Sequence, residues 1–390
     1  MSETRSFTVT QSTRTSQIAA IVAIIGIIAL ISLPWWGTRG QMQLLGQIFA
    51  YLALASLWNL LAGFTGLVSI GQQAYVGFGG YILFALAIFA GVNPLVTIPI
   101  AGVLGALIAI PVATLIFRLS GAYFAIGTWV VAEVFRLVFA QISSLGGGSG
   151  NSLPPYVVRS IASNRDVREM IIYWTALALA LLVIGFVYAL LRTRQGLALT
   201  AIRDNERASE SLGVNIWRTK FIVYVLAAGA TAMIGSLIFI QKLRISPDAA
   251  FSVNDWTAYV IFITVIGGIG RIEGPIVGTV AYFLLRELLS DLGAIYLLIL
   301  GVVAIVIMLR APQGIWGFIA QRYGIELFPV HRRLIAEGVD RDRVGRRVVP
   351  SSASAHPPIP QELASRQTRY FAQLKVWLGF EAKSGRDTPQ

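Results

Sequence analysis

The sequence predicts an all-α polytopic membrane protein. Only 13% of its 390 residues are charged and 56% are hydrophobic, whereas an ordinary soluble domain carries about 25% charged residues. Apolar windows of about 20 residues, the length that crosses a bilayer core of about 30 Å as a helix, recur from Ile18 to Met308. Lys and Arg gather in short stretches between these windows and in the tail, a pattern typical of multi-pass proteins with a basic cytoplasmic side.

The apolar windows predict about ten transmembrane helices. We place them at residues 18–33, 43–62, 72–90, 95–117, 121–141, 170–191, 219–240, 256–270, 275–290 and 294–309. The first window follows Arg5 and Arg14 as in a secretory signal, but no small-residue cleavage pattern comes after it, and Pro34, Trp35 and Trp36 are typical of an interfacial anchor. We therefore expect a retained first helix and one transmembrane domain at 18–320.

The basic connections predict the orientation. Residues 192–220 hold six Lys and Arg, and the tail at 321–390 holds twelve, so both are expected in the cytoplasm. With ten crossings the N-terminal segment 1–17 lies there too, which makes both termini cytoplasmic. Residues 142–169 then lie outside, and Arg39 is a small exception to the charge rule.

Composition excludes several classes of protein. There is no Cys, and both His residues, His331 and His356, lie in the tail, which excludes disulfides, thiolate chemistry and a His-based metal site in the membrane. The net charge of +12 follows the loops, so nucleic acid is not an expected partner. A phosphate-binding loop needs a Gly-rich turn followed by Lys and Ser or Thr, and none of the four lysines follows a Gly. We expect a chain that is not an enzyme, hydrolyses no ATP itself and carries no metal or cofactor.

Two glycine-dense stretches, GFTGLVSIGQQAYVGFGGY at 63–81 and VIGGIGRIEGPIVGTVAY at 265–282, allow two interpretations. Gly270, Gly274 and Gly278 fall at spacing four, which puts them on one helix face and lets two backbones approach closely. Alternatively, TGLVSIGQQAY and GRIEGP are broken or re-entrant segments of the kind that transporters place beside their pathway.

Polar side chains inside the apolar windows are candidates for a translocation path. The amides of Asn59, Gln72 and Gln73 need partners in apolar surroundings, which either interhelical hydrogen bonds or a polar route supply. Glu133 and Arg136 are three residues apart, so they either neutralise each other near the interface or form a polar patch on the path. No string of buried carboxylates is visible, which weakens the case for a proton-driven carrier.

The segment RTRQGLALTAIRDNERASESLGVNIWRTK at 192–220 is charged and helix-competent. Within it, ALTAIRDNERASESLG predicts a short cytosolic helix with Ile202, Ala208, Ser209 and Leu212 roughly on one side and Gly213 at its end. The segment is either a solvated connection that orients its neighbours or a docking element. Its length exceeds what a chain reversal needs, which suggests that something docks there.

These motifs together resemble the permeases of branched-chain amino acid ABC importers. GLALTAIRDNERASESLGVNIWRTK is preceded by NLLAGFTGLVSIGQQAYVGFGGY and GAYFAIGTWVVAEVFRL, and it is followed by VIGGIGRIEGPIVGTVAY and APQGIWGF. The match runs from Leu44 to about Phe318 in the same order, and it is to the second, LivM type of the two permeases. The pattern is shared with close relatives for urea and amides.

By this resemblance the segment 192–220 carries the coupling helix, which inserts into a groove of a separate ATPase subunit. The positions that match the family's loop are Gly196, Ala201, Ile202, Arg203, Asp204, Asn205, Glu206, Ala208, Leu212 and Gly213. Leu197 and Thr200 stand where basic residues are usual, which puts the charge pairing with the ATPase in doubt but not the docking.

The resemblance also marks residues near the pathway. Asn59, Gly66, Ser69, Gly71 and Gln72 fall on a family stretch there, with Gln72 where His is common, and Glu133 and Arg136 match an AE..R pattern. The expected path residues are therefore Asn59, Ser69, Gln72, Gln73, Glu133 and Arg136.

The function implied is that of a permease subunit of an ATP-driven importer, translocating branched-chain amino acids across the bacterial plasma (inner) membrane. The implied partners are a homologous second permease subunit, two ABC ATPase subunits that bind the ATP, an extracytoplasmic substrate-binding protein and the lipid membrane. The same machine for urea or amides stays open as an alternative, as does an ion-coupled secondary transporter. A membrane-embedded enzyme is disfavoured because no catalytic cluster is visible.

The tail departs from the family, whose members typically end soon after the match near Pro312. VVPSSASAHPPIP at 348–360 has the composition of a disordered linker. Apolar residues between Leu363 and Leu378 recur at near-helical spacing with basic neighbours, which predicts either an amphipathic helix on an anionic membrane surface or a frayed extension.

Overall fold

The computed structural model describes residues 7–10, 14–289, 295–311, 313–323, 327–328 and 333–336. The chain divides into two compact units. In the smaller unit, β1 (Phe7–Thr10) pairs antiparallel with β4 (Arg333–Ala336), a strand pair that the sequence did not predict. The linker and the amphipathic helix predicted at 348–378 lie outside the described residues.

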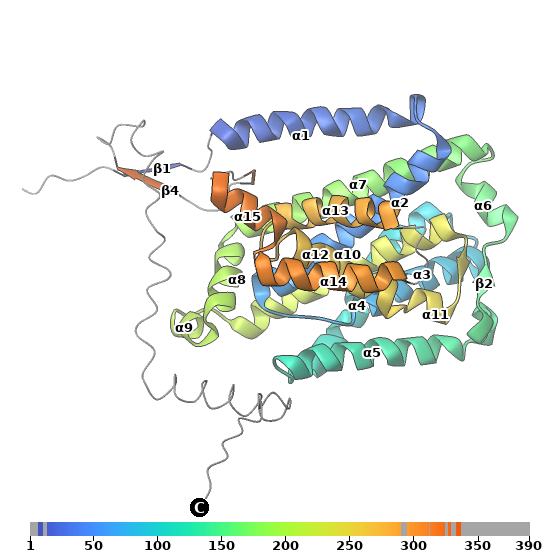
Figure 1. The fold of residues 1–390 in the computed structure, drawn as a ribbon. Helices are drawn as coiled ribbons and strands as arrows, with labels where there is room; N and C mark the ends of the chain where they lie inside the picture. The colour runs from blue at the N-terminus through green and yellow to red at the C-terminus, as the bar shows by residue number, and fades with distance from the viewer. Residues whose placement is uncertain are drawn as a thin grey trace, which may run out of the picture. The chain divides into compact units, whose positions relative to one another are not determined.

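The larger unit, residues 11–332, is a bundle of α-helices (Figure 1). Its long helices are α1 (Arg14–Ser32), α2 (Arg39–Asn59), α3 (Gln72–Phe89), α4 (Pro94–Ile116), α5 (Ala122–Ala140), α7 (Arg165–Arg192), α10 (Ile216–Lys242), α13 (Glu273–Leu289) and α14 (Ile295–Arg310). One further membrane-length stretch is built from α11 (Pro247–Ala250), the π-helix η5 (Asn254–Ala258) and α12 (Tyr259–Gly267). Shorter elements are η1 (Leu33–Trp35), the π-helix η2 (Leu60–Phe64), η3 (Ser143–Leu145), η4 (Gly147–Ser149), α6 (Pro155–Ile161) and α15 (Gly314–Tyr323).

Each of the ten predicted windows overlaps a helix in this structure, although residues 268–270 of the window 256–270 lie in the turn after α12. In the described part of the chain, seven helical stretches are long and apolar enough to cross a membrane. Shorter apolar runs are Ile21–Trp35, in α1 and η1, and Leu298–Ile307, in α14. The protein is therefore an all-α polytopic membrane protein.

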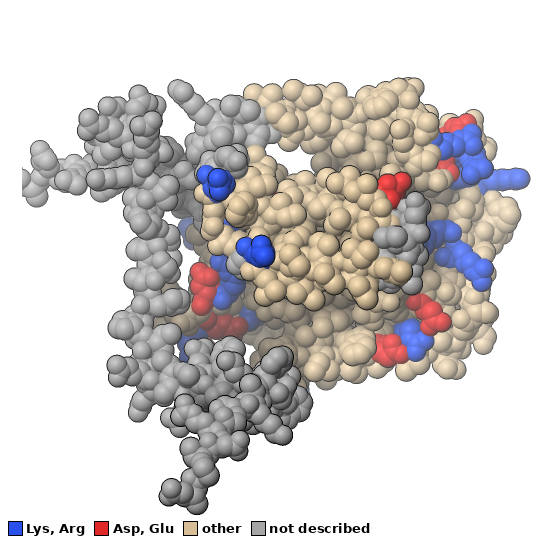
Figure 2. Space-filling view, viewed as in Figure 1, with Lys and Arg blue, Asp and Glu red and all other residues tan. Residues whose placement is uncertain are grey.

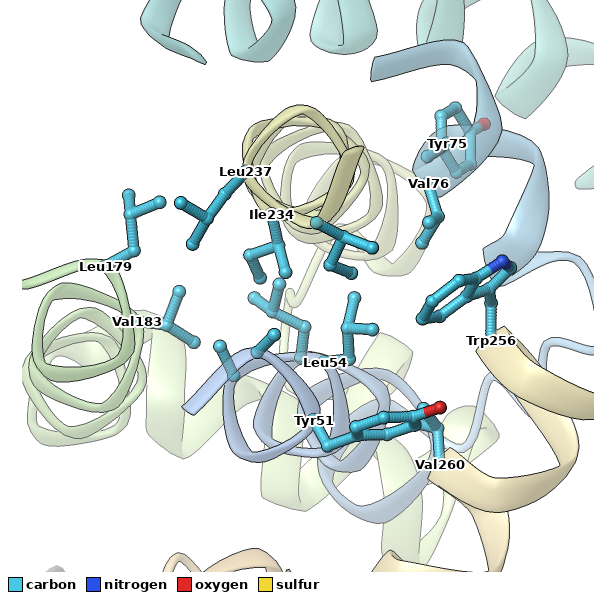
Figure 3. Close-up of a cluster of buried hydrophobic side chains, with 14 of the residues drawn as sticks. Tyr51, Leu54, Tyr75, Val76, Leu179, Val183, Ile234, Leu237, Trp256 and Val260 are labelled. Atoms are coloured by element: carbon cyan, nitrogen blue, oxygen red, sulfur yellow. The ribbon is translucent and has the colours of Figure 1, made fainter. Parts of the chain in front are cut away.

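Helix α10 lies at the centre of the bundle. Its side chains Ile234 and Leu237 point into the buried core, toward Val183 of α7 and Leu54 of α2 (Figure 3). On its other side it packs tightly on α3, because Gly235 of α10 lies so close to the α3 backbone that any side chain there would collide with it. The core is thus held by close backbone approach on one side and by interlocking aliphatic side chains on the other.

Helix α5 has the opposite environment. In its most apolar window 17% of the residues are buried, against 67% in α10. It exposes large apolar side chains such as Tyr123, Trp129 and Val134, and exposed apolar area of this kind suits lipid. On one face of the molecule the charged residues gather at two ends and leave an uncharged band between them (Figure 2), as expected for a bilayer-spanning bundle.

The long helices run between two ends with different connections (Figure 1). The short helices α8 (Arg194–Asp204) and α9 (Glu206–Ser211) lie at one end, here named the α8 end. At the other, the α6 end, lie α6 and a small antiparallel ladder between β2 (Asn151–Ser152) and β3 (Arg244–Ile245).

Both glycine-dense stretches interrupt helices. Residues 66–71 are not helical, and residues 268–272 form a turn between α12 and α13. Gly270 lies in that turn with a φ of +75°, so the prediction that it shares a helix face with Gly274 and Gly278 is wrong. Close packing occurs one turn earlier, where Gly267 of α12 lies against these two glycines of α13. Both interpretations of the stretches therefore hold in part.

Candidate functional site

The loop between α7 and α10 folds into two short helices where one was expected. Helix α8 ends at Asp204, and Asn205 is extended, with φ −160° and ψ 107°. The Asn205 side chain accepts a hydrogen bond from the Ala208 N–H at 3.1 Å and so caps α9. Gly213 follows α9 with a left-handed φ of +83°, at the end of the helical segment as predicted.

The break at Asn205 changes which side chains are exposed. Ile202 of α8 and Ser209 of α9 are buried, but Ala208 is exposed and Leu212 is 82% exposed. The expectation that all four share one side was wrong because it assumed a continuous helix. In the predicted set, the buried or half-buried members are Gly196, Ala201 and Ile202, and the exposed members are Arg203, Asp204, Asn205, Glu206, Ala208, Leu212 and Gly213.

Two basic side chains attach this loop to the bundle. The Nη1 of Arg203 donates a hydrogen bond to the carbonyl of Gly63 in η2 at 3.1 Å, and its Nε donates to Asp204 at 3.1 Å. The Nζ of Lys220 in α10 lies 2.5 Å from the Glu206 carboxylate in α9. The loop is therefore fixed at one point to an interrupted helix and at another to the central helix.

Asn59 joins the two interrupted segments. It is 1% exposed, and its Nδ2 donates to the Arg271 carbonyl at 2.7 Å while its Oδ1 accepts from the Gly270 N–H at 2.8 Å. Gly63, the acceptor of the Arg203 bond, lies directly against Gly270. Separate hydrogen bonds of Asn59 and Arg203 thus meet where Gly63 of η2 lies against Gly270 of the turn between α12 and α13.

Ser69, Gln72 and Gln73 are buried around the start of α3. The Gln72 Nε2 donates to the Leu54 carbonyl of α2 at 3.0 Å, and the Gln73 Oε1 accepts from the Thr257 hydroxyl of η5. These are the interhelical bonds that one interpretation predicted. The Gln72 Oε1 and Gln73 Nε2 have no partner among the described residues. A cavity of about 10 Å³, room for about one water, borders Ser69 and Gln72.

Glu133 and Arg136 form an ion pair on the exposed helix α5. The Arg136 Nη2 lies 2.5 Å from the Glu133 carboxylate, and its Nη1 lies 2.8 Å from Asp248 of α11, a partner that the sequence did not reveal. Their contacts lead to α11 and not to the buried amides of α3, so the structure does not unite the predicted path residues in one site. No group of three or more His, Cys, Asp or Glu side chains in the described residues could hold a metal ion.

Open cavities lie at both ends of the bundle. One of about 480 Å³ at the α8 end is bordered by Phe117, Glu206, Trp217 and Lys220. Another, of about 550 Å³ at the α6 end, is lined by α2, α7, α10, η5, α12 and α13. None of the predicted path residues lines it, because it is assembled from segments far apart in sequence. One signal was visible: Asp255 is an acid within an apolar stretch, and such residues are functional candidates by default.

The apolar multi-helix bundle defines a multi-pass membrane protein. Residues 40–309 match the family model described as branched-chain amino acid transport system / permease component. The chain therefore belongs to this family of transport permease components.

Several relatives support the assignment. The chain is 26% identical over 304 residues to the high-affinity branched-chain amino acid transport system permease protein LivM of Escherichia coli, covering 72% of this chain and 71% of that protein. It is 25% identical over 284 residues to the probable LivM of Methanocaldococcus jannaschii, covering 66% and 80%. The fructose import permease protein FruG of Bifidobacterium longum is 25% identical over 274 residues, covering 66% and 78%. No solved structure matches the chain.

Proposed function

We propose that the chain is a permease subunit of an ATP-driven importer that moves branched-chain amino acids into the bacterial cell. Its partners are a homologous second permease, two ATPase subunits that bind and hydrolyse the ATP, and an extracytoplasmic binding protein that delivers the substrate. The relatives named LivM and LivH are separate permease proteins that both resemble this chain, which supports a pair of homologous permeases. No covalent chemistry is needed in the chain itself.

The observation that carries the proposal is the exposed loop at the α8 end and its connection to the interrupted helices. Leu212 is 82% exposed on the surface of this loop, where a partner can contact it. The neighbouring cavity of about 480 Å³ adds a concave surface beside α9. We place the ATPase against α9 and this cavity.

The mechanism is a population shift between two arrangements of the helices. ATP-bound closure of the ATPases displaces the docked loop, and hydrolysis releases it. The Arg203 bond to Gly63 and the Asn59 bonds to residues 270 and 271 give that displacement a direct route to η2 and to the turn after α12. Interrupted helices are the elements that transporters place beside the pathway.

The topology that fits this role has ten crossings. Taking the α8 end as cytoplasmic places both chain termini there and the α6 end outside. The six Lys and Arg of residues 192–220 support this orientation.

The similarity to a fructose import permease supports a second cargo, a sugar carried by the same kind of machine. Urea or another amide is a third cargo for the assay, and an ion-coupled carrier is the competing mechanism.

The test begins with purification of the tagged chain from its native membrane and identification of its companions by mass. We expect a second permease and two ATPase subunits. The complex in proteoliposomes, supplied with its binding protein, should take up radiolabelled leucine only with ATP, and leucine should be taken up faster than fructose or urea. A chain that purifies alone and transports under an ion gradient without ATP contradicts the proposal.

A further inference from the structure

The cavity at the α6 end has an aromatic floor. Tyr51 of α2 and Trp256 of η5 stack with ring centroids 6.0 Å apart, and Tyr282 of α13 lies 5.9 Å from Tyr51 (Figure 3 shows the first two). Trp256 is 2% exposed, and its indole N–H donates to the Ala249 carbonyl at 2.8 Å. The floor is therefore rigid and apolar, which suits the side chain of a small ligand.

Separate charges of both signs line the same cavity. Lys242, at the end of α10, places its Nζ 4.5 Å from the centroid of the Trp256 ring. Asp255 precedes that tryptophan on η5 and also lines the cavity. Within the described residues, neither side chain forms an ion pair. Glu169, the other acid of the lining, is already bonded at 3.2 Å by the Gln43 amide. Of the two carboxylates in the lining, Asp255 is therefore the one available to bind a ligand.

The backbone around these charges is irregular. Asp255 and Trp256 lie in a π-helix, an element found frequently at functional sites. Leu243, which follows Lys242 and lines the cavity, is the one non-glycine residue with positive φ, +58°, in the described part of the chain. Such conformations persist where the surrounding structure imposes them, and they cluster at ligand sites.

We propose that this cavity binds a zwitterionic α-amino acid with an apolar side chain. Its ammonium group faces Asp255, its carboxylate faces Lys242, and its side chain lies on Tyr51 and Trp256. The volume of about 550 Å³ is within the range of roughly 300–1,000 Å³ for small-molecule sites, so an amino acid fits together with water. The assignment rests on the proposed function, since it makes the cavity the outward-facing substrate site of the permease.

The absence of cysteine from the chain allows a direct test by thiol labelling. Gln47→Cys puts a thiol at an exposed position of the lining, and Ser149→Cys puts one at the same end outside this cavity. In the purified complex, saturating leucine should slow labelling of Gln47→Cys by a charged methanethiosulfonate at least about fivefold. Labelling of Ser149→Cys should be unchanged. Equal rates for Gln47→Cys with and without leucine overturn the proposal.

Ligand chemistry supplies a second arm. 4-Methylpentanoate lacks the ammonium group and 3-methylbutylamine lacks the carboxylate, so each should protect Gln47→Cys only at concentrations at least about tenfold above that of leucine. Asp255→Asn and Lys242→Gln should each raise the protecting concentration of leucine about tenfold. The matched control is Asp166→Asn, on α7 at the same end but outside the lining. The proposal is overturned if leucine does not protect Gln47→Cys but fructose does. It is equally overturned if leucine does not protect it but phosphatidylethanolamine, supplied in nanodiscs that hold the complex, does.

Failure of this site is distinguishable from failure of the proposed function. The wild-type complex can transport leucine with ATP while Asp255→Asn and Lys242→Gln show the wild-type KM and the wild-type protection by leucine. That result would disprove the proposed site but not the proposed importer function. Variants that purify with their companions at the wild-type elution volume are folded, and Asp255→Glu should restore most of the leucine protection.

Discussion

The two ends of the bundle differ in how their candidate sites are encoded. At the α8 end, the loop residues lie within 29 consecutive positions, 192–220, and their pattern is visible in the sequence. At the α6 end, the cavity draws side chains from six separate elements, and a motif search does not find it. A surface that docks a partner can be one local segment, whereas a cavity needs walls on several sides.

The two ends also differ in what their polar groups do. At the α8 end, the amide of Asn59 and the guanidinium of Arg203 are already bonded to backbone atoms inside the protein. At the α6 end, Asp255 and Lys242 face a cavity. We therefore expect replacements at the α8 end to change stability and coupling, and replacements in the cavity to change ligand affinity.

The largest expected effect is on stability, at Asn59. Asn59→Leu leaves the Gly270 N–H and the Arg271 carbonyl without their partner, at a cost of about 1–3 kcal/mol each. The free energy of unfolding in detergent should fall by roughly 2–6 kcal/mol, as measured by thermal and denaturant unfolding. Gln195→Leu, on the exposed surface of α8, is the control and should change it little. Equal effects of the two replacements would show that the Asn59 network does not stabilise the α8 end.

The next effect is on coupling. Glu206→Lys combined with Gly213→Leu reverses a charge and strains the turn after α9. An interface residue of central importance contributes about 2 kcal/mol or more, which corresponds to a loss of roughly 30-fold. ATP-dependent uptake should fall by about that factor while the chain stays folded and inserted. Asp166→Lys at the α6 end, measured in the same assay, should leave uptake nearly unchanged. Wild-type uptake by the double variant removes the docking assignment.

A smaller effect is expected at Arg203. Arg203→Ala removes the bond from α8 to the Gly63 carbonyl, and a hydrogen bond of a charged group contributes about 1.5 kcal/mol or more. Uptake per ATP hydrolysed should fall roughly tenfold. Arg194→Ala tests the same replacement at an exposed position of the same helix. If both variants lose uptake equally, the charge of α8 matters and the link to η2 does not.

The smallest effect is expected at the surface of the α6 end. Arg39 and Asp166 form an ion pair at 2.5 Å, but both side chains are about half exposed. Exposed pairs contribute about 0–1 kcal/mol because water and salt screen them. Asp166→Ala should therefore lower the free energy of unfolding by less than about 1 kcal/mol, and 0.5 M salt should abolish the difference. A larger loss would mean that this end is also held by its polar contacts.

Much of the fold could be predicted from hydropathy alone, since every predicted window overlaps a helix. The failures are local. Asn205 was taken as part of one helix, yet its side chain caps a second one. Gly270 was placed on a helix face, yet its positive φ puts it in a turn. In both cases a short-range preference for a cap or a turn overrode the helical period.

The loop at 192–220 is a local segment that the sequence delimits, and its coupling role stays a prediction. The six expected path residues lie apart: Asn59 is bonded to the turn after α12, Ser69, Gln72 and Gln73 are buried around the start of α3, and Glu133 and Arg136 form an ion pair on α5. Asp248, the third member of that ion pair, lies 112 positions from Arg136. No periodicity within one helix indicates a partner so far away in sequence.

By itself, the sequence determined that this is a multi-pass α-helical membrane protein, because apolar length and charge placement are local properties that a bilayer selects directly. Its permease class followed from the resemblance of its motifs to a known family. Only the tertiary structure decided which polar groups meet. It bonded Asn59 and Arg203 to backbone atoms of distant segments and left Asp255 and Lys242 facing a cavity. Such contacts depend on how helices cross and where they are interrupted, and close backbone packing sets both.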